Sequence, residues 1–178
     1  MKMALLTPCL LLPTIILSLL IPHSCSADET QKLIIQICSR TYDFGYCKSV
    51  FNQHLYTPTM DAQGLTQIAV TQTLISATNT LRFILKTIDS EKSVELKNIY
   101  KICEVGYENL VNEFTDASFD FAKRDYESML FNVGKCDRFV SDCQYVLGNQ
   151  ASDQLSTQNN QNRVLVQMSL FSGQLIGN

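Results

Sequence analysis

The sequence has little of what catalysis in a small domain requires. Its 178 residues include two histidines and no tryptophan, and only His54 lies beyond the N-terminal segment. It has no Gly-x-Ser-x-Gly turn, phosphate-binding glycine loop or His-Glu-x-x-His pair. The cysteine spacings do not match those of a zinc site. We therefore expect a protein that is not an enzyme and that binds no metal or cofactor, with His54 as a solvated residue at a helix end.

Other absences limit the possible fold classes and the possible binding partners. With four prolines, seven glycines and no long run that alternates apolar with polar residues, the sequence disfavours β-structure. It has no Asn-x-Ser/Thr sequon, so no N-glycan is predicted. The net charge is −3 and the basic residues do not cluster, which disfavours binding to nucleic acid or to an anionic membrane.

The N-terminal segment is typical of a secretory signal peptide. Lys2 precedes an apolar run from Ala4 to Ile21, and small residues lead up to Ala27, just before Asp28. The alternative is a retained anchor, since the run approaches the ~20 residues of a bilayer span. We predict a signal peptide over residues 1–27, with cleavage after Ser26 nearly as well supported. Removal takes away one positive charge, that of Lys2, and changes the net charge from −3 to −4.

The remaining residues 28–178 show helical periodicity and suit one domain. A turn around 42–45 and Thr57-Pro58 separate two short helices from the rest, and Asp61 is a good N-cap for the first long helix. Residues 150–162, rich in Gln, Asn and Ser, are predicted to form a solvated loop. The short helices should cover about 33–40 and 50–54, and the long ones about 61–88, 94–110, 115–146 and 164–175. This pattern predicts an all-α fold, a four-helix up-and-down bundle preceded by a short helical hairpin.

Five cysteines remain after cleavage, enough for two disulfides and one leftover thiol in an oxidising compartment. Cys38 and Cys47 flank the hairpin turn, and a bridge between them would close a loop of about ten residues, worth about 2.7 kcal/mol. Cys103 would face either Cys136 or Cys143. Those two lie two helical turns apart, about 10 Å along one helix, so they cannot pair with each other. The spacing alone leaves the partner of Cys103 open.

The segment Ile37–Cys47, ICSRTYDFGYC, resembles the opening of the plant invertase and pectin methylesterase inhibitor family. That family has a Cys, a Thr three residues on, an aromatic and acidic turn, and a second Cys nine residues after the first. The resemblance covers residues 32–176. It continues through Asp61–Leu65, Cys103–Tyr107, Phe121–Tyr126 and Asp142-Cys143.

The resemblance implies the disulfides Cys38–Cys47 and Cys103–Cys143, with Cys136 as a free thiol. The sequence departs from the family at residues 134–137, where GKCD replaces a stretch similar to Ser-Ala-Ala-Leu. This departure places Cys136 at a small-residue position of a helix.

Members of this family inhibit pectin methylesterases or acid invertases, and a rigid helical face would cover the target's substrate cleft. Some invertase inhibitors present a Pro-Lys-Phe segment that this sequence lacks, which favours pectin methylesterase as the partner. An acid invertase is the alternative target, and a non-inhibitory, allergen-like binding module is the alternative function. We expect a monomer or weak dimer secreted to the apoplast and free of the membrane after cleavage, with the vacuole as the alternative location.

The first long helix carries the candidate target-binding residues. Its apolar stripe is formed by Leu65, Ile68, Ile75, Leu81, Ile84 and Ile88. A polar stripe lies away from it and consists of Gln67, Thr71, Thr78 and Arg82. An ordinary hydrated face is the alternative explanation of this polar stripe.

Overall fold

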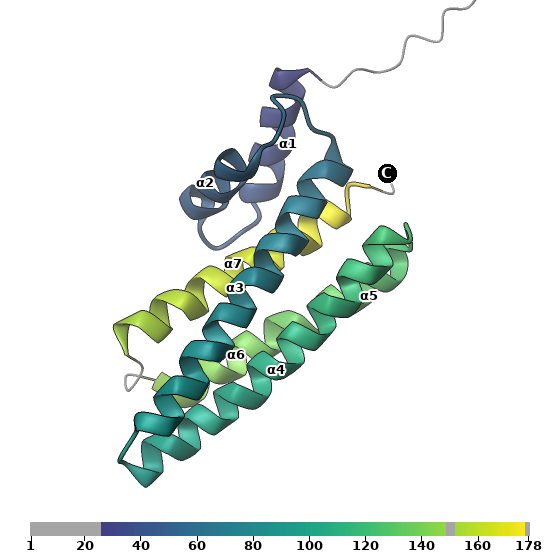
Figure 1. Cartoon of the computed structure of the whole chain (residues 1–178). Coiled ribbons are helices and arrows are strands. Elements are labelled where there is room, and N and C mark those ends of the chain that lie inside the picture. Colours follow the sequence, from purple (N-terminus) through teal and green to yellow (C-terminus); the bar gives the residue numbers. More distant parts are fainter. Residues whose placement is uncertain (1–25, 149–151, 177–178) are drawn as a thin grey trace, which may run out of the picture.

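The computed structural model describes residues 26–148 and 152–176, in which helices joined by short connections form the fold and no strand occurs. Figure 1 shows a short hairpin set on one end of a bundle of long helices. The predicted all-α class and the hairpin-plus-bundle architecture are confirmed. The hairpin consists of α1 (Ala27–Cys38) and α2 (Phe44–His54). The bundle consists of α3 (Ala62–Ser90), α4 (Val94–Ala122), α5 (Tyr126–Gly134), α6 (Cys136–Leu147) and α7 (Asp153–Gly173).

Side-chain caps explain where most of the helices begin. Asp61 starts α3 as predicted, because its carboxylate accepts a hydrogen bond of 2.8 Å from the Gly64 amide. Ser26 caps α1 in a reciprocal arrangement, in which its hydroxyl accepts from the Glu29 amide and its own amide donates to the Glu29 carboxylate. Apart from Ser26 and Ala27, the predicted signal peptide 1–27 lies outside the described residues.

The break predicted between two helices around residues 110–115 is wrong. Helix α4 continues to Ala122 because Leu110, Phe114 and Ala117 extend its buried face without interruption. The chain turns instead at Arg124, whose φ of 62° lies in the left-handed region, and Asp125 then caps α5. Helices α5 and α6 follow each other with only Lys135 between them, and together they form the third rod of the bundle.

The solvated loop predicted over residues 150–162 is also wrong for the part that the structure describes. Ser152 caps α7, which runs through the polar segment from Asp153 onward. Asn159 and Asn162 are fully buried there. An asparagine is a poor interior helix residue by propensity, so the pattern favoured a loop. Tertiary hydrogen bonds to both amides reverse that local preference.

The apolar interior has two parts. The core of the bundle lies between α3, α4, α5, α6 and α7, around Tyr107 and Phe114. The second core lies between the hairpin and the adjoining ends of α3 and α7, around Ile34, Phe51 and Leu65. None of the described helices is both long enough and apolar enough to cross a membrane.

The apolar stripe predicted for α3 requires one correction. Ile75 is 49% exposed and faces away from the core, while Thr73, Ala77 and Thr80 occupy the buried positions around it. The hydroxyl groups of Thr73 and Thr80 each donate a hydrogen bond to a backbone carbonyl one turn back, as in the 2.7 Å bond from Thr73 to Ala69. Small buried side chains allow a helix to approach its neighbours closely, and α3 is flanked by α4 and α7.

Candidate functional site

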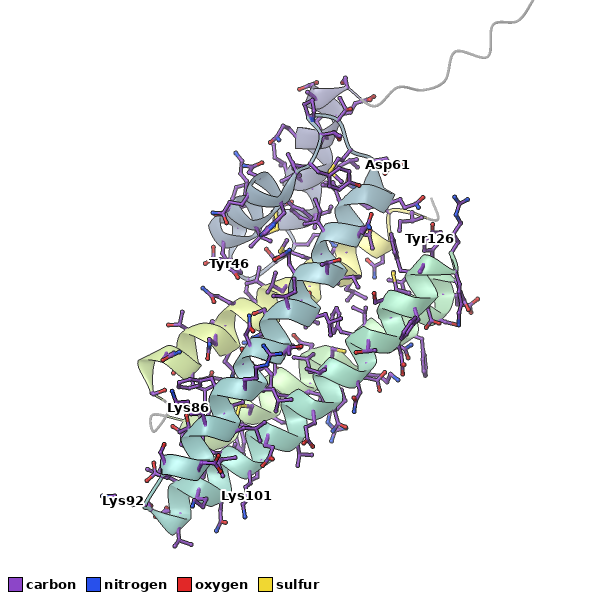
Figure 2. The ribbon with its side chains drawn as sticks, in the orientation of Figure 1. Tyr46, Asp61, Lys86, Lys92, Lys101 and Tyr126 are labelled. Carbon is purple, nitrogen blue, oxygen red and sulfur yellow. A yellow bond between two sulfur atoms is a disulfide. The ribbon has the colours of Figure 1, made fainter. Side chains whose placement is uncertain are left out.

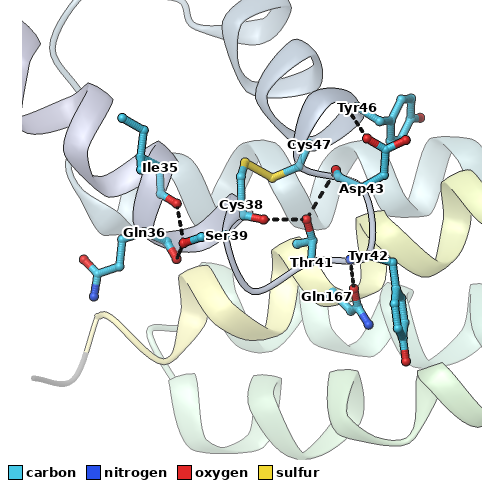
Figure 3. The surroundings of a disulfide bond; sticks show 10 residues. All are labelled: Ile35, Gln36, Cys38, Ser39, Thr41, Tyr42, Asp43, Tyr46, Cys47 and Gln167. Carbon is cyan, nitrogen blue, oxygen red and sulfur yellow. Dashed lines mark hydrogen bonds between the residues drawn. A yellow bond between two sulfur atoms is a disulfide. The ribbon is translucent and has the colours of Figure 1, made fainter.

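The hairpin is closed by the disulfide Cys38–Cys47, whose Cα atoms lie 5.5 Å apart (Figure 3). Beside it the Thr41 hydroxyl donates to the Cys38 carbonyl at 2.8 Å, and the Asp43 carboxylate accepts from the Tyr46 amide at 2.9 Å. The backbone N–H of Tyr42 donates to Gln167 Oε1 of α7 at 3.0 Å. The turn is therefore held both within itself and against the bundle.

The second disulfide, Cys103–Cys143, joins α4 to α6 in the buried core, with a Cα separation of 4.6 Å. The two helices approach closely one turn further along. A Cβ atom added to Gly106 would lie 3.0 Å from the carbonyl oxygen of Phe139. Glycine at this position allows the helix contact that the disulfide requires.

Cys136 is a free thiol at the first residue of α6 and is fully buried. Its sulfur donates to the Asn132 carbonyl at 3.3 Å. Burial raises the pKa of the Cys136 thiol to about 12, and the nearby charge of Glu113 acts in the same direction. The sulfur is therefore protonated and shielded at neutral pH, which does not suit a nucleophile.

A buried polar network crosses the bundle, and the helical periodicity of the sequence did not predict it. The Tyr107 hydroxyl donates to Asn159 Oδ1 at 2.7 Å, and Asn162 Nδ2 donates to Thr80 Oγ1 at 3.0 Å and to the Tyr107 oxygen at 3.3 Å. Burial raises the pKa of Tyr107, so its hydroxyl stays protonated as a donor. The sequence feature that could have indicated this network is the spacing of Asn159 and Asn162, which lie three residues apart and therefore on one side of a helix.

The four candidate target-binding residues share one side of α3. Gln67 and Thr78, like Thr71 and Arg82, are eleven residues apart, which is close to three full turns. Gln67, Thr71 and Arg82 are exposed, whereas Thr78 is half-buried and donates its hydroxyl to the Leu74 carbonyl at 2.7 Å. The exposed Ile75 lies on the same side. We call these five residues the α3 face.

The described residues hold no group of three or more His, Cys, Asp or Glu side chains arranged to bind a metal ion. His54 is exposed at the last residue of α2, as predicted. Within the described ranges, the site candidates are thus a set of structural disulfides and an outward helix face.

The comparisons with known proteins agree with this arrangement. The plant invertase/pectin methylesterase inhibitor family matches residues 32–171. No curated protein matches the chain. A mutant form of an Arabidopsis pectin methylesterase inhibitor is a similar solved structure, with a TM-score of 0.71 and 20% identity over 78% of this chain and 93% of that one.

A second similar structure is a pectin methylesterase inhibitor from Arabidopsis thaliana, with a TM-score of 0.62. It is also 20% identical, over 81% of this chain and 96% of the other. At this identity the likeness shows a shared fold. The family match spans most of the sequence, and the chain therefore belongs to the plant invertase/pectin methylesterase inhibitor family, whose members are inhibitors and not enzymes.

Proposed function

We propose that this protein inhibits a pectin methylesterase by binding over the enzyme's active-site cleft, with the α3 face as the contact surface. The family match over residues 32–171 is the observation that carries the proposal, because it restricts the target to a pectin methylesterase or an invertase. The absence of a Pro-Lys-Phe segment favours the first of these targets.

The shape of the molecule supports a mechanism of occlusion. Helix α3 has 29 residues, so it extends about 44 Å at about 1.5 Å per residue. It lies between α4 and α7 and contacts the hairpin at its N-terminal end. A surface that is already ordered loses little conformational entropy on binding, which leaves more of the contact energy available for affinity.

The composition of the α3 face also suits a protein interface. Ile75 offers an exposed apolar side chain, and the polar residues Gln67, Thr71 and Arg82 lie one to two turns from it on the same side of α3. Interfaces commonly place an apolar centre within a polar rim, and arginine is enriched among the residues that dominate binding. We expect Ile75 and Arg82 to contribute more to the binding free energy than the hydroxyl groups of Thr71 and Thr78.

We further propose that residues 1–27 are removed and that residues 28–178 act in the apoplast, as a monomer or weak dimer. The two disulfides fit an oxidising compartment. The second candidate is inhibition of an acid invertase, in the apoplast or the vacuole, for which the family membership is the support.

Titration of the purified secreted protein against a plant pectin methylesterase and against an acid invertase tests the function. Stoichiometric loss of esterase activity, with the invertase unaffected, is the expected result. Loss of invertase activity alone would assign the other target. Full activity of both enzymes across several isoforms would reject inhibition and leave a non-inhibitory binding module. Each titration should be repeated with reduced and alkylated protein, which should lose its effect if the folded bundle is the active form.

A further inference from the structure

A polar groove runs along the junction between the hairpin and the bundle. One hollow of about 420 Å³ lies between the α1–α2 turn and α7, and a second of about 360 Å³ lies between α2, α3 and α7. Tyr46 and Gln161 line both hollows, so the two lie next to each other, and we call them together the groove. Figure 2 shows Tyr46 on the edge of the hairpin that faces the bundle.

The walls of this groove are rich in groups that both donate and accept hydrogen bonds. Among the described residues, six side-chain amides line it, namely Gln53, Gln72, Asn79, Gln158, Asn160 and Gln161. The buried Oε1 atom of Gln158 has no hydrogen-bond partner in that part of the chain. An amide presents a donor and an acceptor side by side, which matches the adjacent hydroxyl groups of a sugar ring.

The end of the groove next to the α1–α2 turn holds an arginine beside an exposed aromatic side chain. The guanidinium carbon of Arg163 lies 4.1 Å from the centre of the Tyr42 ring, and Tyr42 is 67% exposed. Among the residues that the structure describes, Arg163 forms no ion pair, and its buried Nε atom has no hydrogen-bond partner. Asp43 also lines this end, but its carboxylate accepts the Tyr46 amide as the cap of α2.

We propose that this groove binds an acidic oligosaccharide made of uronic acid units. One uronate carboxylate pairs with the guanidinium of Arg163, which is planar and suited to two parallel hydrogen bonds. A sugar ring packs its C–H face on the exposed ring of Tyr42, and further hydroxyl groups bond to the amides along the groove. A polyphosphate is disfavoured because it has no hydroxyl groups for these amides, and because Arg163 is the only Lys or Arg among the described residues that lines either hollow.

This inference deepens the proposed function and rests on it for the choice of sugar. A pectin methylesterase converts methyl-esterified galacturonate units into free carboxylates, so the groove would recognise the product of the proposed target. Binding to the groove does not require the enzyme. It can therefore be measured on the inhibitor alone, separately from inhibition.

Calorimetric titration and NMR chemical-shift mapping of the purified secreted protein test the proposal with three probes. The first is a short oligomer of galacturonic acid, the second is its fully methyl-esterified form, and the third is a glutamate peptide of matched length and charge. We expect the free acid to shift the signals of Tyr42 and Gln161 and to bind about tenfold more tightly than the ester, because a charge-assisted pair is lost on esterification. Equal binding of peptide and oligomer would overturn the proposal, since it would show a general anion site.

Two variants and one control locate the site. Arg163→Gln should weaken binding of the free acid about tenfold and should leave the esterified form unchanged. Tyr42→Ala, at an exposed position that is safe for folding, should weaken both forms. Arg138→Gln removes a matched charge from the exposed side of α6 and should change neither. Wild-type binding by both Arg163→Gln and Tyr42→Ala, or no binding of any probe to the folded protein, would reject the groove as a sugar site whatever the enzyme titrations show.

Discussion

The hydroxyl group of Tyr107 in α4 donates a hydrogen bond of 2.7 Å to Asn159 Oδ1 in α7, and both side chains are fully buried. The amide group of Asn159 then donates to the Val140 carbonyl and to Gln144 Oε1 of α6, at 3.3 and 2.9 Å. Asn162 connects the same network to Thr80 of α3. One set of polar side chains therefore links α3, α4, α6 and α7, and it favours the single register in which all these bonds form.

Replacing Tyr107 by phenylalanine tests this network. The substitution removes one hydroxyl and leaves Asn159 Oδ1 buried without its donor, so we expect a loss of about 1 to 2 kcal/mol in the free energy of unfolding. Urea denaturation measures the change. Tyr145→Phe is the matched control, because Tyr145 is 87% exposed and should behave as wild type. An unchanged unfolding free energy for Tyr107→Phe would show that the network sets the register of the helices without adding to their stability.

The two disulfides should differ in their contribution to stability. Replacing Cys103 and Cys143 together by alanine opens a loop of about 41 residues and should cost about 3.9 kcal/mol. Replacing Cys38 and Cys47 opens a loop of about ten residues and should cost about 2.7 kcal/mol. Chemical denaturation of the two double variants measures both values. Peptide mapping without reduction checks the pairing, and a linked Cys103–Cys136 peptide would contradict it.

The raised pKa of the Cys136 thiol should make the stability of the protein depend on pH. Its pKa is raised from 9.0 to about 12 in the folded protein, so the folded state holds the thiol proton more tightly than the unfolded state does. The resulting stabilisation is fully present below pH 9.0 and is lost as the pH rises from there toward about 12. Unfolding free energies of wild type and Cys136→Ala, compared from neutral pH to about pH 11, should converge above pH 9.

Thiol labelling gives an independent check on Cys136. In native protein at neutral pH, iodoacetamide should leave it unmodified, because it is buried and protonated. Labelling should become rapid once denaturant unfolds the chain. Fast labelling of the native protein would show that the α5–α6 junction opens readily.

Cleavage of the N-terminal segment should alter the start of α1. N-terminal sequencing of the secreted protein should give Asp28 as the first residue. Such cleavage removes Ser26, and with it the reciprocal cap formed with Glu29. A chain that begins at Ser26 should therefore exceed one that begins at Asp28 by about 1 kcal/mol in the free energy of unfolding. Equal stabilities in thermal or urea denaturation would show that tertiary contacts alone hold the first turn.

Substitutions on the α3 face should weaken inhibition without destabilising the bundle. Arg82→Glu reverses an exposed charge and Thr71→Arg adds bulk, and each should raise the inhibition constant about tenfold or more, as expected for an interface residue. Thermal unfolding should remain as in wild type because both positions are exposed. Arg138→Glu, on the exposed side of α6, is the matched control. Wild-type inhibition by both α3 variants would place the contact surface elsewhere.

Local patterns predicted the parts of the fold that depend on local physics. The apolar positions at helical spacing and the N-cap Asp61 identified the start of α3, since capping involves residues three positions apart. The end of α4 was misplaced because the left-handed turn at Arg124 has no glycine to mark it. Ile75 was assigned to the core because its hydrophobicity does not show which side of α3 packs inward.

The helical class, the hairpin and the family membership follow from local features of the sequence, because periodicity, turn residues and cysteine spacing involve residues close together in the chain. The helical state of residues 153–162 and the groove between the hairpin and the bundle depend instead on how the helices pack. Asn159 and Asn162 favour a loop when considered alone. Partners up to 82 residues away, such as Thr80, form hydrogen bonds with their side-chain amides inside the bundle. Hydrogen bonds of this kind cannot be predicted from local sequence, because their partners come together only when the helices pack.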